Sequence, residues 1–183
     1  EPAVKPAALH TATGVIGVLA TAGTLGGAKY IRTRQTYASG VRVVEHVGEG
    51  FVELVENGVL SGPEAERVVR ASLSPLLDAG ADVIVLGCTH YPFLMDVIRK
   101  IAGPGVTIID PAPAVARHLA DVLASVAPSR HPASSPSASS SSASSGLLEE
   151  PHLVMPTPRI RLYSSGSPDS MIRIFDTCVA PYL

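Results

Sequence analysis

Apolar and polar positions along the first two thirds of the chain follow two alternating patterns. Short, β-prone apolar runs predict strands at 15–20, 41–46, 82–86 and 106–109. The segments between them carry helical spacing or helix-boundary residues and predict helices near 25–33, 51–57, 61–78, 92–100 and 111–126. This alternation is typical of an α/β fold, a doubly wound and mainly parallel sheet with helices on both faces.

Several polar residues stand where helices are expected to begin. Ser61 is followed three positions later by Glu64, which is the spacing of a capping box. Asp110 precedes a proline and is best explained as the cap of the next helix. Near the end of the chain, residues 160–163 predict one more strand, and Ser167 predicts the start of a last short helix.

Residues 127–150 form a Ser/Pro/Ala-rich segment with nine serines between positions 134 and 145. Such a sequence buries too little apolar surface to offset the entropy of ordering it, so we expect a disordered insert. A tolerated surface insertion is the favoured interpretation, and a phosphorylated or partner-binding segment is the alternative.

Composition narrows the function classes. The chain has 183 residues and a formal net charge of only -2, so its charge gives no general reason to expect binding to nucleic acid or to an acidic membrane surface. The apolar runs are too short to span a bilayer. The two cysteines, Cys88 and Cys178, lie far apart and make no disulfide scaffold, which favours a reduced compartment. The spacing of His and Cys residues suggests no metal site.

Cys88 is the residue whose position points most directly to chemistry. It lies where the buried strand 82–86 ends, just before a helix expected from Pro92, and the carboxyl ends of strands carry the functional loops of open α/β sheets. The positive end of a helix dipole favours a thiolate there. His90 can exchange protons near neutral pH, so a thiol acting as base or nucleophile is indicated. An inert, packed cysteine is the alternative.

The run Val85-Leu-Gly-Cys-Thr-His-Tyr-Pro-Phe-Leu94 resembles the second-cysteine motif of glutamate racemases, in the aspartate/glutamate racemase superfamily. Residues 17–24 resemble the family's Thr-containing loop, and residues 51–56 are similar to the segment that bears its acidic residue. The resemblance covers residues 1–123 and resumes after the serine-rich insert, where 160–166 resemble the final strand.

The resemblance implies cofactor-independent inversion at the Cα of glutamate by two thiols, one on each face. Carried over to this chain, it implies catalytic roles for Cys88, His90 and Glu56, and substrate binding by Thr89, Thr21 and Thr24. It implies no cofactor and no metal. The product D-glutamate would serve peptidoglycan synthesis in the cytoplasm, without a nucleic-acid or membrane partner, and a homodimer is left open.

Each of these residues also has a simpler explanation. Glu56 at the end of a short helix is by default a solvated acid, and Thr21 and Thr24 suit a cap or turn. His90 could bind a backbone carbonyl. Cys178, in a C-terminal helix outside the motifs, is expected to be a buried or idle thiol.

The resemblance also implies a domain organisation. Residues 1–110 would form the second racemase domain, 111–126 a helix returning to the first domain, 127–150 the insert, and 151–183 the strand and helix of the first domain. The family's first catalytic cysteine has no counterpart, so we expect an incomplete copy that does not racemise glutamate alone. The sequence at Gly48-Glu-Gly50 also departs from the Cys-Pro pair of many members.

Two other functions stay open. One is a broader amino-acid or hydantoin racemase, against which His90 after Cys-Thr argues. The other is a non-catalytic remnant that binds an acidic amino acid.

Overall fold

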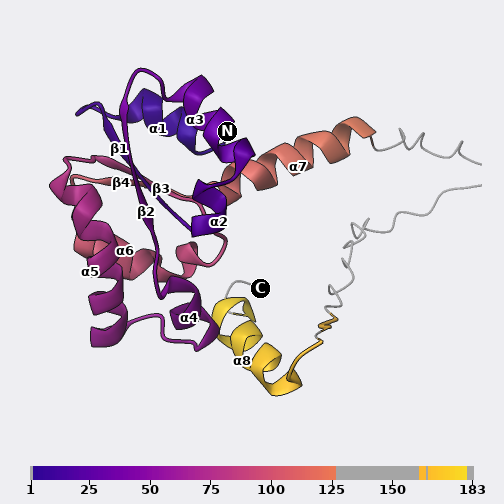
Figure 1. Ribbon diagram of the computed structural model, residues 1–183. Helices are drawn as coiled ribbons and strands as arrows, with labels where there is room; N and C mark the ends of the chain where they lie inside the picture. Colours follow the sequence, from indigo (N-terminus) through magenta and orange to yellow (C-terminus); the bar gives the residue numbers. More distant parts are fainter. Residues whose placement is uncertain (1, 127–160, 164, 181–183) are drawn as a thin grey trace, which may run out of the picture.

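The computed structural model describes residues 2–126, 161–163 and 165–180, and its centre is a four-stranded parallel sheet (Figure 1). The strands are β1 (Val15–Ala20), β2 (Arg42–Val47), β3 (Val83–Leu86) and β4 (Thr107–Ile109). Their order is β2-β1-β3-β4, with Ile16 of β1 paired to Val43 on one side and to Val83 on the other. The direction of winding therefore reverses between β1 and β3, which confirms the predicted doubly wound α/β fold.

Helices cover both faces of the sheet (Figure 1). The helices are α1 (Val4–His10), α2 (Ala22–Leu25), α3 (Ala28–Tyr37), α4 (Phe51–Glu56), α5 (Gly62–Asp78), the 3-10 helix η1 (Tyr91–Leu94), α6 (Met95–Ala102), α7 (Ala112–Val126) and α8 (Pro168–Cys178). The α1–α3 side and the α4–α5–α6 side each have their own apolar core.

Alternation along the strands explains why there are two cores. Ile84 and Leu86 of β3 join the core beneath α5, whereas Val83 and Val85 face the core beneath α1. All four side chains are almost fully buried, as expected for a parallel sheet covered on both sides.

The predicted apolar stripe of α5 packs on the sheet. Val69, Leu73 and Leu76 are fully buried. A Cβ at Gly17 of β1 would lie 3.1 Å from the Cδ1 atom of Leu76, so the absence of a side chain lets α5 approach the sheet closely. The other predicted members of the stripe, Val68 and Leu77, pack at its margin.

One predicted helix boundary and one predicted capping interaction differ from the structure. The helix expected at 25–33 is divided, because α2 ends at Leu25 and α3 begins only after Gly26 and Gly27 and continues to Tyr37. Ser61 is the N-cap residue of α5, as predicted, but it does not form the side-chain hydrogen bond of a capping box. Gly62 has a φ of +88°, so the first turn departs from the geometry that the box requires.

The last part of the sequence gives a mixed result. Ser167 caps α8 by accepting a hydrogen bond from the backbone N–H of Ser170, as predicted for its start. Residues 161–163 are not in a strand, because a strand requires a hydrogen-bonded neighbour and β1–β4 do not pair with them. The predicted disordered insert 127–150 lies outside the described residues, as does Ile160.

The helix α7 begins as predicted, but it makes few contacts with the rest of the structure. Asp110 caps it by accepting a hydrogen bond from the N–H of Ala112 at 2.9 Å. From there α7 projects away from the sheet (Figure 1), and its large apolar side chains are exposed: Val115, Leu119, Val122, Leu123 and Val126.

A carboxylate joins the amino end of β3 to the loop before β1. Asp82 accepts hydrogen bonds from the hydroxyls of Thr11 and Thr13 and from the N–H groups of Ala12 and Thr13. Burial raises the pKa of Asp82, but these hydrogen bonds outweigh burial and lower the pKa to about 2.

Within the described residues, no helix has the combination of length and apolar character needed to cross a membrane.

Candidate active site at the carboxyl ends of β1 and β3

The carboxyl ends of β1 and β3 bring two of the predicted loops together. Gly87 donates its N–H to Leu19 O at 2.8 Å, and a Cβ at Gly87 would lie 2.7 Å from that of Ala20. The glycine thus lets the two strand ends approach closely. Thr21 and Cys88 are the next residues on each strand, so Cys88 lies at the topological switch point, where open α/β sheets bind ligands.

Three predicted catalytic side chains form one line of contacts. The Cys88 Sγ atom lies 3.8 Å from His90 Nδ1, and His90 Nε2 lies 2.7 Å from Glu56 Oε1. The turn that holds Cys88 and His90 is closed by the N–H of Tyr91, which donates to Cys88 O at 3.3 Å. Glu56 is the last residue of α4, 34 positions earlier in the sequence than His90.

This geometry assigns a tautomer to His90. A proton on Nε2 is donated to the Glu56 carboxylate, which leaves Nδ1 as an acceptor facing the Cys88 thiol. The imidazole can then accept the thiol proton, and the carboxylate stabilises the imidazolium that results. The arrangement can therefore supply a thiolate and hold its proton on His90, two positions along the chain.

The line of contacts is open to solvent on the Glu56 side. The His90 side chain is 31% exposed and the Glu56 side chain 51%. Water screens a partly exposed pair of this kind. The contact therefore orients the His90 ring more than it adds to the free energy of unfolding. Glu56 is partly solvated, as its simpler explanation expects, whereas His90 binds the Glu56 carboxylate rather than a backbone carbonyl.

The three predicted binding threonines are placed differently from one another. Thr89 is exposed in the turn between Cys88 and His90. The hydroxyls of Thr21 and Thr24 lie 2.9 Å apart, and Thr21 also caps α2 by accepting the N–H of Thr24 at 3.3 Å. The capping explanation for Thr21 is therefore confirmed, and its ligand role stays a prediction.

Tyr91 is a buried residue of the site that sequence reasoning did not single out. Its hydroxyl donates to Gly48 O at 3.4 Å, and its ring meets that of Phe51 edge-on with centroids 4.8 Å apart. Burial, then the charge of Cys88 and that of Glu53, raise the pKa of Tyr91 to about 12, despite the opposing hydrogen bond to Gly48. The available signal was the Gly48-Glu-Gly50 sequence, which differs from the Cys-Pro pair that the resemblance leads one to expect.

Cys178 of α8 is buried, as predicted, and joins the core beneath α4 and α5. Burial, and next the charge of Glu56, raise the pKa of the Cys178 thiol. A thiol held in its neutral form has little nucleophilic character, so Cys88 and not Cys178 has the setting of a reactive cysteine.

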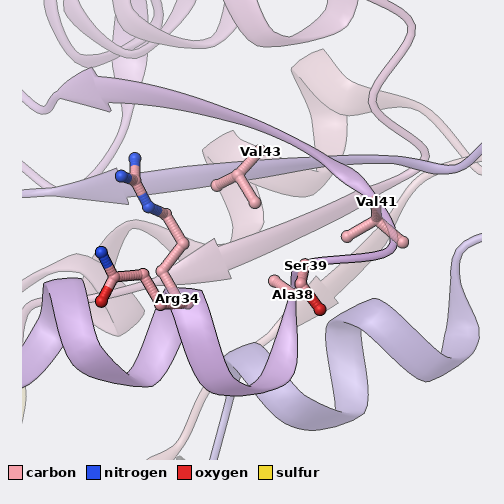
Figure 2. Close-up of a pocket in the computed structure, with 6 residues that line it drawn as sticks. Arg34, Ala38, Ser39, Val41 and Val43 are labelled. Atoms are coloured by element: carbon pink, nitrogen blue, oxygen red, sulfur yellow. The ribbon is translucent and has the colours of Figure 1, made fainter.

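Away from the candidate site, a hollow of about 380 Å³ lies between α3 and the amino end of β2 (Figure 2). It is lined by Arg34, Gln35, Ala38, Ser39, Val41 and Val43. The Arg34 guanidinium, its one charged group, is already engaged with Glu45 at 2.7 Å. This hollow lies at the opposite ends of the strands from Cys88, so a molecule bound in it would not reach the Cys88 thiol.

Among the described residues, no cluster of three His, Cys, Asp or Glu side chains could hold a metal ion.

Comparison with known proteins connects this site to a family. The family model described as Asp/Glu/Hydantoin racemase matches residues 1–119. Glutamate racemases of Roseiflexus sp. (strain RS-1) and Herpetosiphon aurantiacus are 50% identical over 122 residues and 47% identical over 125 residues. These matches cover 67% and 68% of this chain, and 45% and 49% of the relatives.

Solved structures agree in fold. A glutamate racemase isoform of Bacillus anthracis superposes with a TM-score of 0.61 at 32% identity, over 69% of this chain and 47% of that one. The Escherichia coli glutamate racemase, solved with L-glutamate and the activator UDP-MurNAc-Ala, gives a TM-score of 0.61 at 31% identity, over 68% and 48%.

The chain thus spans about half the length of the curated relatives it matches. The family model covers well over half of the chain itself and includes the strands β1–β4 with the Cys88 turn. This chain therefore belongs to the Asp/Glu/Hydantoin racemase family.

Proposed function

We propose that this chain carries one of the two proton-transfer faces of a glutamate racemase, with Cys88 as the thiol that acts at Cα. The contacts from Cys88 through His90 to Glu56 are the observation that carries the proposal. They give the thiol a proton acceptor and give that acceptor a carboxylate partner, as abstraction of a proton from a weak carbon acid requires. The names of the relatives support glutamate as the substrate.

The proposed reaction on this face consists of two successive proton transfers. The Cys88 thiol first gives its proton to His90 Nδ1; the resulting thiolate then takes the Cα proton of glutamate, leaving a carbanion and a neutral thiol. The reverse transfer returns a proton to the same face. Inversion requires a second thiol on the opposite face of the substrate, and Cys178 is too deeply buried to serve.

Substrate binding is assigned to groups at the two strand ends. Thr89 is exposed beside the thiol, and Thr21 and Thr24 lie after the neighbouring strand. Hydroxyls and strand-end N–H groups are suitable donors to the two carboxylates of glutamate and to the negative charge that develops at Cα. This arrangement needs neither a metal nor an organic cofactor.

The proposed domain organisation follows the resemblance. Residues 1–110 form the second racemase domain, and α7 leads from it toward the first domain, to which residues 151–183 also belong. The exposed apolar side of α7 supports this part of the proposal, because a helix that packs against further polypeptide needs such a side. A product role in peptidoglycan synthesis and a cytoplasmic location are parts of the same proposal.

Deuterium exchange at Cα tests the role of Cys88. The chain is incubated with L- or D-glutamate in D₂O; the Cα–H signal is followed by NMR and racemisation by circular dichroism. We expect exchange of one enantiomer without racemisation, its loss in Cys88→Ser, and its retention in the control Cys178→Ser.

Each other result contradicts a defined part of the proposal. Exchange that survives Cys88→Ser excludes the thiol as the base. Rapid racemisation by the chain alone contradicts the single-face assignment. A wild-type chain that shifts the NMR signals near Cys88 on adding glutamate, yet exchanges nothing, supports the alternative of a non-catalytic module that binds acidic amino acids.

A further inference from the structure

Tyr91 connects the turn that holds the thiol to the helix that holds the acid. It follows His90 directly and begins η1. Its side chain is fully buried and lies against the loop between β2 and α4, where its hydroxyl faces Gly48 O at 3.4 Å. Its ring packs edge-on against Phe51, the first residue of α4, with an interplanar angle of 60°.

Gly48 leaves room for the Tyr91 ring because it has no side chain. A Cβ at Gly48 would lie 2.5 Å from the Tyr91 hydroxyl oxygen and 2.6 Å from Cζ, far inside van der Waals contact. The same Gly48 carbonyl accepts the N–H of Phe51 at 3.3 Å. The Tyr91 side chain, the Gly48 backbone and the start of α4 are therefore packed as one unit.

The helix α4 is thus held at both of its ends by the turn that follows β3. Phe51 at its start contacts Tyr91, and Glu56 at its end contacts His90. The helix α4 is a single segment of six residues, about 9 Å long. A displacement of Phe51 at its start is therefore transmitted to Glu56 at its end. A displacement of about 1 Å would stretch the 2.7 Å contact between Glu56 and His90 beyond hydrogen-bond distance.

We infer that Tyr91 is a positioning residue: its buried ring, seated on Gly48 and Phe51, fixes Glu56 at the distance from His90 that prepares the Cys88 thiol. This deepens the proposed function, on which it rests for the role of Cys88. Tyr91 acts through packing rather than as an acid, because burial and the nearby Cys88 and Glu53 raise its pKa to about 12 and keep the phenol neutral.

The first experiment observes the His90–Glu56 contact directly by ¹⁵N–¹H NMR of labelled histidines, with His90→Gln for assignment. In the wild-type chain we expect a protected Nε2 proton. Tyr91→Met fills most of the space but lacks the rigid ring, and it is expected to lose this signal. Tyr91→Phe keeps the ring and is expected to retain it. Phe93→Met, which removes a ring from the same 3-10 helix η1, is the matched control and is expected to leave the signal in place.

The second experiment measures alkylation of Cys88 by iodoacetamide, resolved from Cys178 by peptide mass spectrometry. We expect Tyr91→Met and Glu56→Gln each to slow alkylation of Cys88 by about two- to fivefold, the range for a partly exposed ion pair. The double variant should be no slower than either single variant, because both remove the same contact. A general loss of structure would instead accelerate alkylation of both cysteines.

Two results would overturn the inference: a His90 signal that persists in Tyr91→Met, or rate effects of Tyr91→Met and Glu56→Gln that add. If Tyr91→Met does not fold, Gly48→Ala tests the same contact from the other side and is expected to lose the signal too. Neither measurement involves glutamate, so Tyr91 can be confirmed even if the deuterium-exchange experiment rejects the proposed function.

Discussion

His90 is the residue through which the candidate site acts, because it contacts both the thiol and the carboxylate. With Nε2 facing Glu56, only Nδ1 is left for Cys88. Neither contact is deeply buried, so the arrangement of the three side chains matters more than the strength of any single bond.

Replacing His90 by Gln removes the proton acceptor and keeps a polar side chain of similar reach. We expect Cα exchange to fall by about 100-fold, the lower end for loss of general acid–base catalysis. The exchange assay in D₂O measures this. The control His10→Gln lies in α1 and should exchange at the wild-type rate. Wild-type exchange in His90→Gln would show that Cys88 loses its proton by another route.

The lowered pKa of Asp82 leads us to expect that acid reduces the free energy of unfolding. Its pKa of about 2 lies below the ordinary value of 3.8 for an aspartate side chain, so the unfolded chain binds the proton more readily than the folded chain. The stabilisation is present above about pH 5 and is lost as the pH falls toward 2. Because the carboxylate is partly exposed, we expect its contribution to the free energy of unfolding to be about 1 kcal/mol. Urea unfolding from pH 7 to 3 measures this loss, and Asp82→Asn should flatten the curve; an unchanged curve would contradict it.

At the scale of elements, the closeness of β1 and β3 decides where the site lies. Gly87 carries no side chain at the point where a Cβ would meet Ala20 at 2.7 Å, and Gly17 similarly admits Leu76 of α5. These contacts fix the spacing of the strands beneath the Cys88 turn. The geometry of the site is therefore set by small residues that take no part in the chemistry.

Gly87→Ala is expected to lower the free energy of unfolding by about 1–3 kcal/mol, the usual cost of overpacking, because Ala20 belongs to a strand that cannot move aside. Gly105→Ala is the matched control: nothing lies within 4 Å of its Cβ, and its stability should stay within about 0.5 kcal/mol of the wild type. Chemical denaturation of both variants measures the difference. Equal stabilities would mean that the strand ends separate easily.

For the whole molecule, the notable contrast is between the packed sheet and the exposed helix α7. The sheet and its covering helices contain nearly all the buried apolar residues, whereas the large apolar residues of α7 face solvent. The structure thus combines a well-packed domain with a helix whose apolar side is free to contact further polypeptide.

Stability measurements can separate these two parts. Leu119→Gln with Leu123→Gln should change the free energy of unfolding by less than about 0.5 kcal/mol, because both side chains are more than half exposed. Leu73→Ala, in the fully buried stripe of α5, should cost about 2–5 kcal/mol. Urea titrations of the two variants give both values. A large loss in the α7 variant would mean that α7 packs on the domain in solution.

Local pattern was sufficient for much of the fold. The apolar run of β1 predicted its bounds without error, and the caps at Asp110 and Ser167 were also predicted, because each feature depends on neighbouring residues. The errors at Ser61 and at 25–33 arose where glycines changed the backbone locally. The sequence also placed Cys88 at the end of a buried strand, with His90 within reach.

Only the tertiary structure decided which distant residues complete the site. The order β2-β1-β3-β4 brings the loop after β1 beside Cys88, and α4 brings Glu56 to His90 across 34 positions. The contact between Tyr91 and Gly48 likewise joins residues that are 43 positions apart in the sequence. Such contacts leave no periodic signal in the sequence, because they depend on how the helices pack on the sheet rather than on the propensities of neighbouring residues.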